Sequence, residues 1–446
     1  MTIPAPMSSS QRLLAIGLVL GVSLVAFEIT AVVTAMPTIT DELGGTSLYG
    51  LAIAAYTLAN MVALVAAGEL ADRRGPVMPY MISIATFIVG LLVAASAHSM
   101  VMVVIGRTLQ GAGTGGLQPL SYTLVNRAFP PERQAKIFAV LSAGWVLPSL
   151  FAPAISGWVV ATFGWRWVFL GIIPLAIAVA ALAIRPMRHY GQSAFTDAPS
   201  RIPHAVAAAV GVGAMATGLQ MANPVGAVVL TVAGGATAWW ALGTLLPAGV
   251  ELARTGLAAL VACRFLATAA FMGADSFIPL AADRIHRVSP LWQGMVIIGA
   301  ALSWTAGQWI RAHKPPTDAA RAVREGFLVL ALGVVMVIPV LWDSWPLWAV
   351  FLGWSVGGLG MGLLFNPTTV AVMTYAKDGV EGKVSSQVAL ADALGYSLMG
   401  AVGGATVAVA DRGSMPISTA LGINLAIAFG LAMVGAAVSH RIRSAT

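Results

Sequence analysis

The sequence predicts an all-α integral membrane protein with about fourteen transmembrane helices, and three observations support this class. The first is composition: of 446 residues, 58% are hydrophobic and 9% are charged, with a mean hydropathy of +0.87. A soluble domain carries about 25% charged residues, so this chain cannot cover itself with a water-compatible surface. The other two observations are the long apolar runs and the placement of basic residues between them.

The apolar runs are long enough to cross a bilayer, which takes about 20 residues per helix. We expect the first six near residues 12–37, 49–71, 77–97, 100–126, 134–162 and 166–185. Two shorter runs follow near 204–221 and 224–246, and the last six lie near 257–281, 290–311, 324–342, 346–375, 384–410 and 416–439. This order predicts an N-terminal six-helix bundle (1–185), a polar stretch with two linker helices (186–256) and a C-terminal six-helix bundle (257–446).

Basic residues gather in alternate loops, as the positive-inside rule expects for a multi-pass protein of the cell membrane with both termini in the cytoplasm. Counting 204–246 as one span would place the cluster Arg311, Lys314, Arg321 and Arg324 outside, which argues for two linker helices. The same placement accounts for the net charge of +7 without nucleic acid as a partner.

Several kinds of chemistry have no support in the sequence. The single cysteine, Cys263, excludes an internal disulfide and makes a cysteine metal site improbable. The chain has no Gly-x-x-x-x-Gly-Lys-Ser/Thr loop to hold ATP, and no cluster of catalytic groups at one interface. We therefore expect neither a metal, nor a cofactor, nor an enzymatic activity.

A charged turn, Gly68-Glu69-Leu70-Ala71-Asp72-Arg73-Arg74-Gly75, lies between the second and third apolar runs. It resembles the loop after the second helix of the major facilitator superfamily, although Pro76 and Val77 stand where that family has basic residues. The resemblance implies that Gly68, Asp72, Arg73 and Gly75 form a conformational latch, and we name residues 68–75 the latch turn.

Further motifs resemble the fourteen-helix drug:proton antiporter branch of this superfamily. The first-helix motif is present around Glu28, with Glu in place of Asp, and Arg107 begins an Arg-x-x-Gln-Gly motif. The antiporter-like motif of the fifth helix, with Pro148, Pro153 and Gly157, is degraded: Pro153 and Gly157 fit it, but Pro148, Ala152 and Ser156 stand where glycine is expected. A purely structural kink gives the same pattern.

The two halves also repeat each other, since GRTLQGAGTGGLQP at 106–119 is similar to GWSVGGLGMGLLFNP at 353–367. Such repeats place a substrate site near the bilayer midplane, between the halves. We expect this substrate cavity to be lined by Asp275, Gln110, Trp145, Asn366 and Trp354, and helix packing is the alternative explanation for either tryptophan.

Ionisable groups inside the spans are the clearest functional signal, because each costs at least about 2.5 kcal/mol at a helix centre. Glu28 and Arg107 both lie roughly 10–14 Å below the outer surface at about 1.5 Å per residue, so they can pair. Such a pair can bind and release a proton, because a conformational change alters either the desolvation of the acid or its distance from the base. The alternative is a static structural pair.

Two further sites of buried charge lie in the second half. Arg264 and Asp392 have matching depths from the inner surface, and here a structural pair is the favoured interpretation. Asp275 has no base at its depth. It holds a cationic substrate or a second proton, or it is merely hydrated in an outer vestibule.

Together these patterns predict a secondary active transporter, acting as a monomer, that exports hydrophobic or amphipathic small molecules in exchange for protons. The alternatives are a proton-linked importer, a carrier of amphipathic lipids, and a membrane sensor or scaffold that transports nothing. Charges retained at depth argue against the scaffold, which has no need of them.

Overall fold

The computed structural model describes residues 7–44, 48–190, 199–221, 223–287, 290–314, 316, 318–376 and 380–442, which form helices and turns without any β-strand. Eleven of the described helices are long and apolar enough to cross a membrane. The prediction of an all-helical membrane fold is confirmed at that level, whereas the count of fourteen crossings is not.

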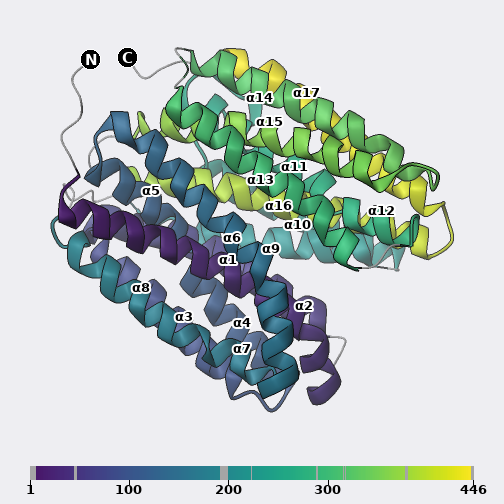
Figure 1. Cartoon of the computed structure of the whole chain (residues 1–446), viewed down its shortest axis with the longest axis horizontal. Helices are drawn as coiled ribbons and strands as arrows, with labels where there is room; N and C mark the ends of the chain where they lie inside the picture. The colour runs from purple at the N-terminus through teal and green to yellow at the C-terminus, as the bar shows by residue number, and fades with distance from the viewer. Residues whose placement is uncertain are drawn as a thin grey trace. The chain divides into compact units, whose positions relative to one another are not determined.

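The chain folds into two compact units, shown as ribbons in Figure 1. Unit 1 is Met1–Pro203 with Ala376–Ser386, and unit 2 is His204–Tyr375 with Gln387–Thr446. The unit 1 helices are α1 (Ser9–Leu43), α2 (Tyr49–Arg74), α3 (Val77–Ala95), α4 (Met100–Thr114), α5 (Leu117–Ala128), α6 (Pro131–Phe163), α7 (Arg166–Leu170) and α8 (Ile172–Met187).

The helices after α8 lie wholly or mainly in unit 2. They are α9 (Ile202–Gln220), α10 (Pro224–Leu245), α11 (Leu257–Asp275), α12 (Ile278–Arg284), α13 (Pro290–His313), α14 (Ala319–Val337), α15 (Leu347–Met373), α16 (Glu381–Asp411) and α17 (Ile417–Val438). The helix α16 begins in unit 1, to which residues up to Ser386 belong, and continues in unit 2.

Within unit 1, α1 packs along α6 and α8, and α4 packs against α2 and α3 (Figure 1). Small residues bring these helices together. A methyl group at Gly106 would collide with Ala94 of α3, and one at Gly111 would collide with the backbone of Tyr56 of α2. Close contact through glycine is a common way for membrane helices to associate, because lipid supplies little hydrophobic drive between them.

The span predicted at 100–126 consists of two helices in the structure. The helix α4 ends at Thr114 and α5 begins at Leu117, with Gly115 and Gly116 between them. Both glycines are in close contact with neighbours, Gly115 with Asn60 of α2 and Gly116 with Ser83 of α3. Neither α4 nor α5 alone reaches membrane-spanning length, which is one reason why the described residues give fewer than fourteen spans.

In unit 2, α15 packs against α13 and α14, while α11 packs against α17 and α15. The two linker helices form a hairpin, since Gly211 and Gly218 of α9 approach the backbone of α10 closely. Two hydrogen bonds join this hairpin to α16 and to the residue directly after it. Gln387, near the start of α16, donates to the Leu245 carbonyl at 3.0 Å, and Arg412, just after the end of α16, donates to the Gln220 carbonyl at 3.0 Å. The outward face of α10 is apolar and exposed, as expected for a helix in contact with lipid.

Candidate functional site

Glu28 of α1 and Arg107 of α4 form an ion pair inside unit 1, between Oε1 and Nη1. Both side chains are buried, and the same Arg107 nitrogen donates to Oε1 of Gln110 at 2.6 Å. The guanidinium also lies over the ring of Tyr56, 4.2 Å from its centroid. The contact expected from equal helical depth is therefore present, and Gln110 is part of it.

This buried cluster contains polar atoms without a partner. Oε2 of Glu28 and Nε2 of Gln110 are buried and accept or donate no hydrogen bond within the described part of the chain. A buried polar group left unpaired costs about 1–3 kcal/mol, and each of these atoms has the capacity for a further hydrogen bond. A proton on Oε2 would remove the charge of Glu28 and turn that oxygen into a donor.

Tyr56 of α2 is the member of this cluster that the sequence did not suggest. Its ring lies under the Arg107 guanidinium that pairs with Glu28, and its hydroxyl accepts from Thr114 Oγ1 at 2.8 Å. Asn60, one turn further along α2, donates to the same Thr114 hydroxyl at 3.2 Å. Asn60 is half-buried, so a line of polar groups runs from the fully buried Glu28 toward a more accessible part of α2.

Arg264 of α11 and Asp392 of α16 form the second buried ion pair, inside unit 2. Arg264 Nε donates to Asp392 Oδ1 at 3.0 Å, and Nη2 pairs with Oδ2. Thr268 also donates to Oδ1, at 3.1 Å, while Arg264 Nη1 donates to Thr369 at 2.5 Å. The guanidinium stacks on the ring of Phe365 at 3.5 Å. Both carboxylate oxygens of Asp392 are thus occupied.

Asp275, at the end of α11, accepts a hydrogen bond from the indole nitrogen of Trp354 at 2.7 Å. Trp354 is fully buried and stacks on Phe271, with ring centroids 5.0 Å apart. Phe271 makes a second contact with Trp304 at 5.0 Å, which in turn lies 5.3 Å from Phe365. Two residues expected in the substrate cavity, Asp275 and Trp354, are therefore bonded to each other beside an aromatic cluster.

Polar groups without partners also lie next to that aromatic cluster. Gln308, one turn after Trp304 on α13, is fully buried, and both its amide atoms lack a hydrogen-bond partner within the described residues. The indole nitrogen of Trp304 is also buried and also lacks a hydrogen-bond partner within the described residues. Gln308 was not predicted from the sequence, although an amide in an apolar run is the signal that would have found it. Asn366 is buried on α15.

The latch turn has a defined structure inside unit 1. Both oxygens of Asp72 accept backbone hydrogen bonds from the first turn of α16, from Gly382 N at 2.6 Å and Lys383 N at 2.7 Å. A carboxylate is stabilised at a helix N-terminus by the free amides and the helix dipole. Gly68 leaves the space that this approach needs, since a methyl group there would collide with the backbone of Gly382.

The other latch residues have different contacts. Arg73 pairs with Glu69 at 2.9 Å, and Gly75 ends α2 with a positive φ of 78°. Beside the turn, Arg127 of α5 makes a two-pronged ion pair with Glu381, at 3.1 and 2.9 Å. Glu69 also accepts from the backbone of Arg201 at 2.8 Å, a contact that the sequence did not predict.

The antiporter-like motif lies in α6, which runs unbroken through Pro148 and Pro153. Contact with α1 comes from Ser156, which donates to the Ala31 carbonyl at 2.7 Å, and from the close approach of Gly144 to α1. Gly157 has open space where its side chain would be, so it does not mediate this contact. Trp145 is 39% exposed.

Long apolar helices with paired charges buried among them define the class of this protein: a multi-pass membrane transporter. Its residues 18–400 match the family model of the major facilitator superfamily. The chain belongs to that superfamily, whose members in general are not enzymes.

Relatives and solved structures agree with this family. The chain is 28% identical over 438 residues to a probable multidrug-efflux transporter of Mycobacterium tuberculosis, covering 93% of this chain and 89% of the relative. It is 32% identical to the multidrug transporter protein MdtP of Bacillus subtilis over 180 residues, or 40% of this chain and 33% of that protein.

Two solved structures share the fold. The human organic anion transporter MFSD10 matches with a TM-score of 0.73 at 14% identity, covering 96% of this chain and 99% of the other. The proton:xylose symporter XylE matches with a TM-score of 0.68 at 13% identity, covering 96% and 95%.

Proposed function

We propose that this transporter exports hydrophobic or amphipathic small molecules in exchange for protons, and that Glu28 carries the proton. The observation that supports this most directly is the buried Glu28–Arg107 pair with one carboxylate oxygen left without a partner among the described residues. In the proton-free state the arginine balances the ionised acid. In the protonated state the neutral acid tolerates separation from the arginine, so proton binding and helix movement are linked.

The export of apolar molecules is supported by two features. The Mycobacterium tuberculosis relative that matches over 438 residues is a probable multidrug-efflux transporter. Unit 2 contains the aromatic cluster beside Asp275 and Gln308. Flat aromatic side chains offer apolar surface to varied ligands, while few polar groups orient them. We therefore assign substrate contacts to Trp354, Asp275 and Asn366 in unit 2 and to Gln110 and Trp145 in unit 1.

Alternating access also requires a contact that opens and closes. The Asp72 carboxylate bonds the first turn of α16, and the rest of that helix belongs to unit 2. We assign Gly68, Asp72, Arg73 and Gly75 to this latch turn, which would hold the start of α16 in one state of the cycle and release it in another. The placement of basic residues supports a cytoplasmic location for the turn and for both termini, in the cell membrane.

The experiment uses purified protein in liposomes with an imposed pH gradient, after a thermal-shift screen with lipophilic dyes and drugs has found a ligand. Glu28→Gln keeps the size of the side chain but cannot ionise, so gradient-driven transport should fall at least tenfold while ligand binding and exchange persist. The matched control is Glu42→Gln, which removes a partly exposed acid paired with Arg166 near the end of the same helix. Wild-type rates that ignore the pH gradient would disprove proton coupling, and a normal rate in Glu28→Gln would disprove the assignment of the site.

A further inference from the structure

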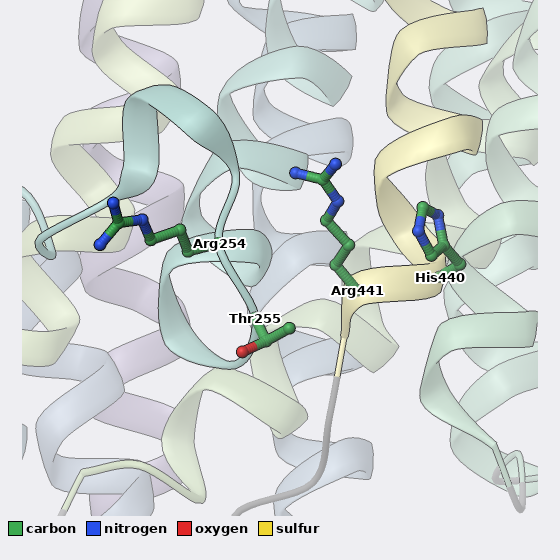
Figure 2. Close-up of a pocket in the computed structure, with 4 residues that line it drawn as sticks. All are labelled: Arg254, Thr255, His440 and Arg441. Atoms are coloured by element: carbon green, nitrogen blue, oxygen red, sulfur yellow. The ribbon is translucent and has the colours of Figure 1, made fainter.

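A pocket of about 440 Å3 lies in unit 2, between the end of α17 and the connector that joins α10 to α11. It is lined by Arg254 and Thr255 of the connector and by His440 and Arg441 after α17. Figure 2 shows Arg441 and His440 extending from the end of α17, while the Arg254 side chain extends from the connector away from Arg441.

The charge of this pocket is not balanced by acids. Within the described part of the chain, no carboxylate oxygen lies within 4.0 Å of the Arg254 or Arg441 nitrogens. The connector holds one acid, Glu251, which is exposed. Two uncompensated guanidinium groups therefore make a local excess of positive charge, which favours an anionic ligand.

The pocket is preformed, because the two segments around it are bonded to each other. Arg441 donates to the carbonyl of Leu252 at 2.6 Å, and its own carbonyl accepts from Gly256 at 3.3 Å. The connector turns through Ala253, whose φ of 45° is unusual for a residue with a side chain. The Arg441 contact at this turn uses Nη1 and leaves the other guanidinium nitrogens for a ligand.

The position of the pocket indicates where the anion comes from. It lies where three membrane-length segments end, Pro224–Leu245, Leu257–Arg284 and Ile417–Arg441. Helix ends of this kind lie at the depth of the lipid headgroups. Leu252, beside the pocket, is 60% exposed, as expected for an apolar side chain that contacts acyl chains.

We propose that this pocket binds the phosphate of an anionic membrane phospholipid. Arginine is well suited to phosphate because its planar donors match the phosphate oxygens. Arg441 contacts the phosphate, while Arg254 adds positive potential at the rim. Basic pockets between helices on the cytoplasmic side of a membrane are suited to such headgroups, and the distribution of basic residues predicts that this end is cytoplasmic.

The test is native mass spectrometry of the purified full-length protein with dioleoylphosphatidylglycerol, which is anionic, and dioleoylphosphatidylcholine, which has the same phosphodiester but no net charge. One phosphatidylglycerol should remain bound per protein at concentrations where phosphatidylcholine is lost. Arg254→Gln with Arg441→Gln should weaken its binding about fivefold for each guanidinium removed. Arg254→Lys with Arg441→Lys keeps the charges and should keep most of the binding.

The matched control is Arg324→Gln, which removes an exposed charge from α14 in the same unit but not from the pocket. Equal binding of the two lipids, or equal loss of phosphatidylglycerol in the control, would overturn the proposal. So would inorganic phosphate that raises the melting temperature as much as phosphatidylglycerol does, because the pocket would then be a soluble anion site. If the double glutamine variant is not monodisperse, Arg254→Gln alone is compared with Arg324→Gln. The proposal does not depend on proton coupling.

Discussion

Each unit has an ion pair between an acid and an arginine of its spanning helices, Glu28–Arg107 in unit 1 and Asp392–Arg264 in unit 2, and the two pairs differ in how far their hydrogen bonds are satisfied. In unit 2, both oxygens of Asp392 have partners, and Thr268 supplies a further bond. In unit 1, Arg107 contacts one oxygen of Glu28, and the other oxygen has no partner within the described residues. A saturated pair holds helices together, whereas an unsaturated one leaves a place for a proton, so we interpret the first as structural and the second as functional.

The largest loss of stability is expected for Arg264→Met, about 3–5 kcal/mol, because this change leaves Asp392, whose side chain is only 14% exposed, without its main partner. The measurement is the unfolding free energy or melting temperature in detergent. Arg107→Met is the matched variant in unit 1 and should cost less at acidic pH, since Glu28 can lose its charge by taking a proton on its free oxygen. If the two variants lost the same unfolding free energy at every pH, the interpretation of one pair as structural and the other as functional would be wrong.

Both oxygens of the Asp72 carboxylate also have hydrogen-bond partners, but these are two backbone amides of α16 and not an arginine. Asp72→Asn keeps one acceptor oxygen and removes the charge, so one of the two amides loses its charged acceptor and the cap should weaken by about 1–2 kcal/mol. Amide hydrogen exchange in the first turn of α16, at residues 381–386, should become faster. Arg74→Gln is the control, because Arg74 is exposed on the same turn and contacts Met78 alone among the interactions of the described residues. Unchanged exchange in Asp72→Asn would show that the cap does not stabilise this turn.

Tyr56→Phe removes the hydroxyl that lies between Glu28 and Thr114, and nothing else in the cluster. The hydroxyl is a polar neighbour of the Glu28–Arg107 pair, and an interaction of this kind is worth about 1 kcal/mol, which corresponds to somewhat less than one pH unit. The pH at which proton-driven transport is half-maximal should therefore move by up to about one unit. Tyr49→Phe, at the start of the same helix, should leave it unchanged. A normal pH profile in Tyr56→Phe would exclude the hydroxyl from the proton site.

Much of this architecture could be predicted because the hydropathy of a segment and the depth of a residue in its helix can both be counted directly from the sequence. Hydropathy indicates the helices, and depth along a helix brings Glu28 to the level of Arg107. What depth does not give is the direction in which a side chain points around its helix. For that reason Tyr56 and Gln308, which carry no charge, were missed, although each belongs to a buried cluster.

Close backbone contacts could not be predicted from the sequence either. The break between α4 and α5 follows from the contacts of Gly115 and Gly116 with α2 and α3, which no hydropathy profile records. The bond between Glu69 and Arg201 joins positions 132 residues apart and likewise leaves no local pattern.

The smallest expected effect concerns the antiporter-like motif, where Gly144 and Gly157 are both glycines of α6 but have different surroundings. A methyl group at Gly157 meets no atom within 4 Å, whereas one at Gly144 would lie 3.1 Å from Ser23 Oγ and 3.3 Å from the Val19 carbonyl of α1. Gly157→Ala should therefore change stability by no more than about 0.5 kcal/mol, apart from a small gain in helix propensity. Gly144→Ala should lower the melting temperature, because α1, which carries Glu28, must move to accept the methyl group. Both variants are measured by melting temperature and by gradient-driven transport. A large transport defect in Gly157→Ala with normal stability would show that this glycine acts in another state of the transport cycle, and that the motif is more than a packing surface.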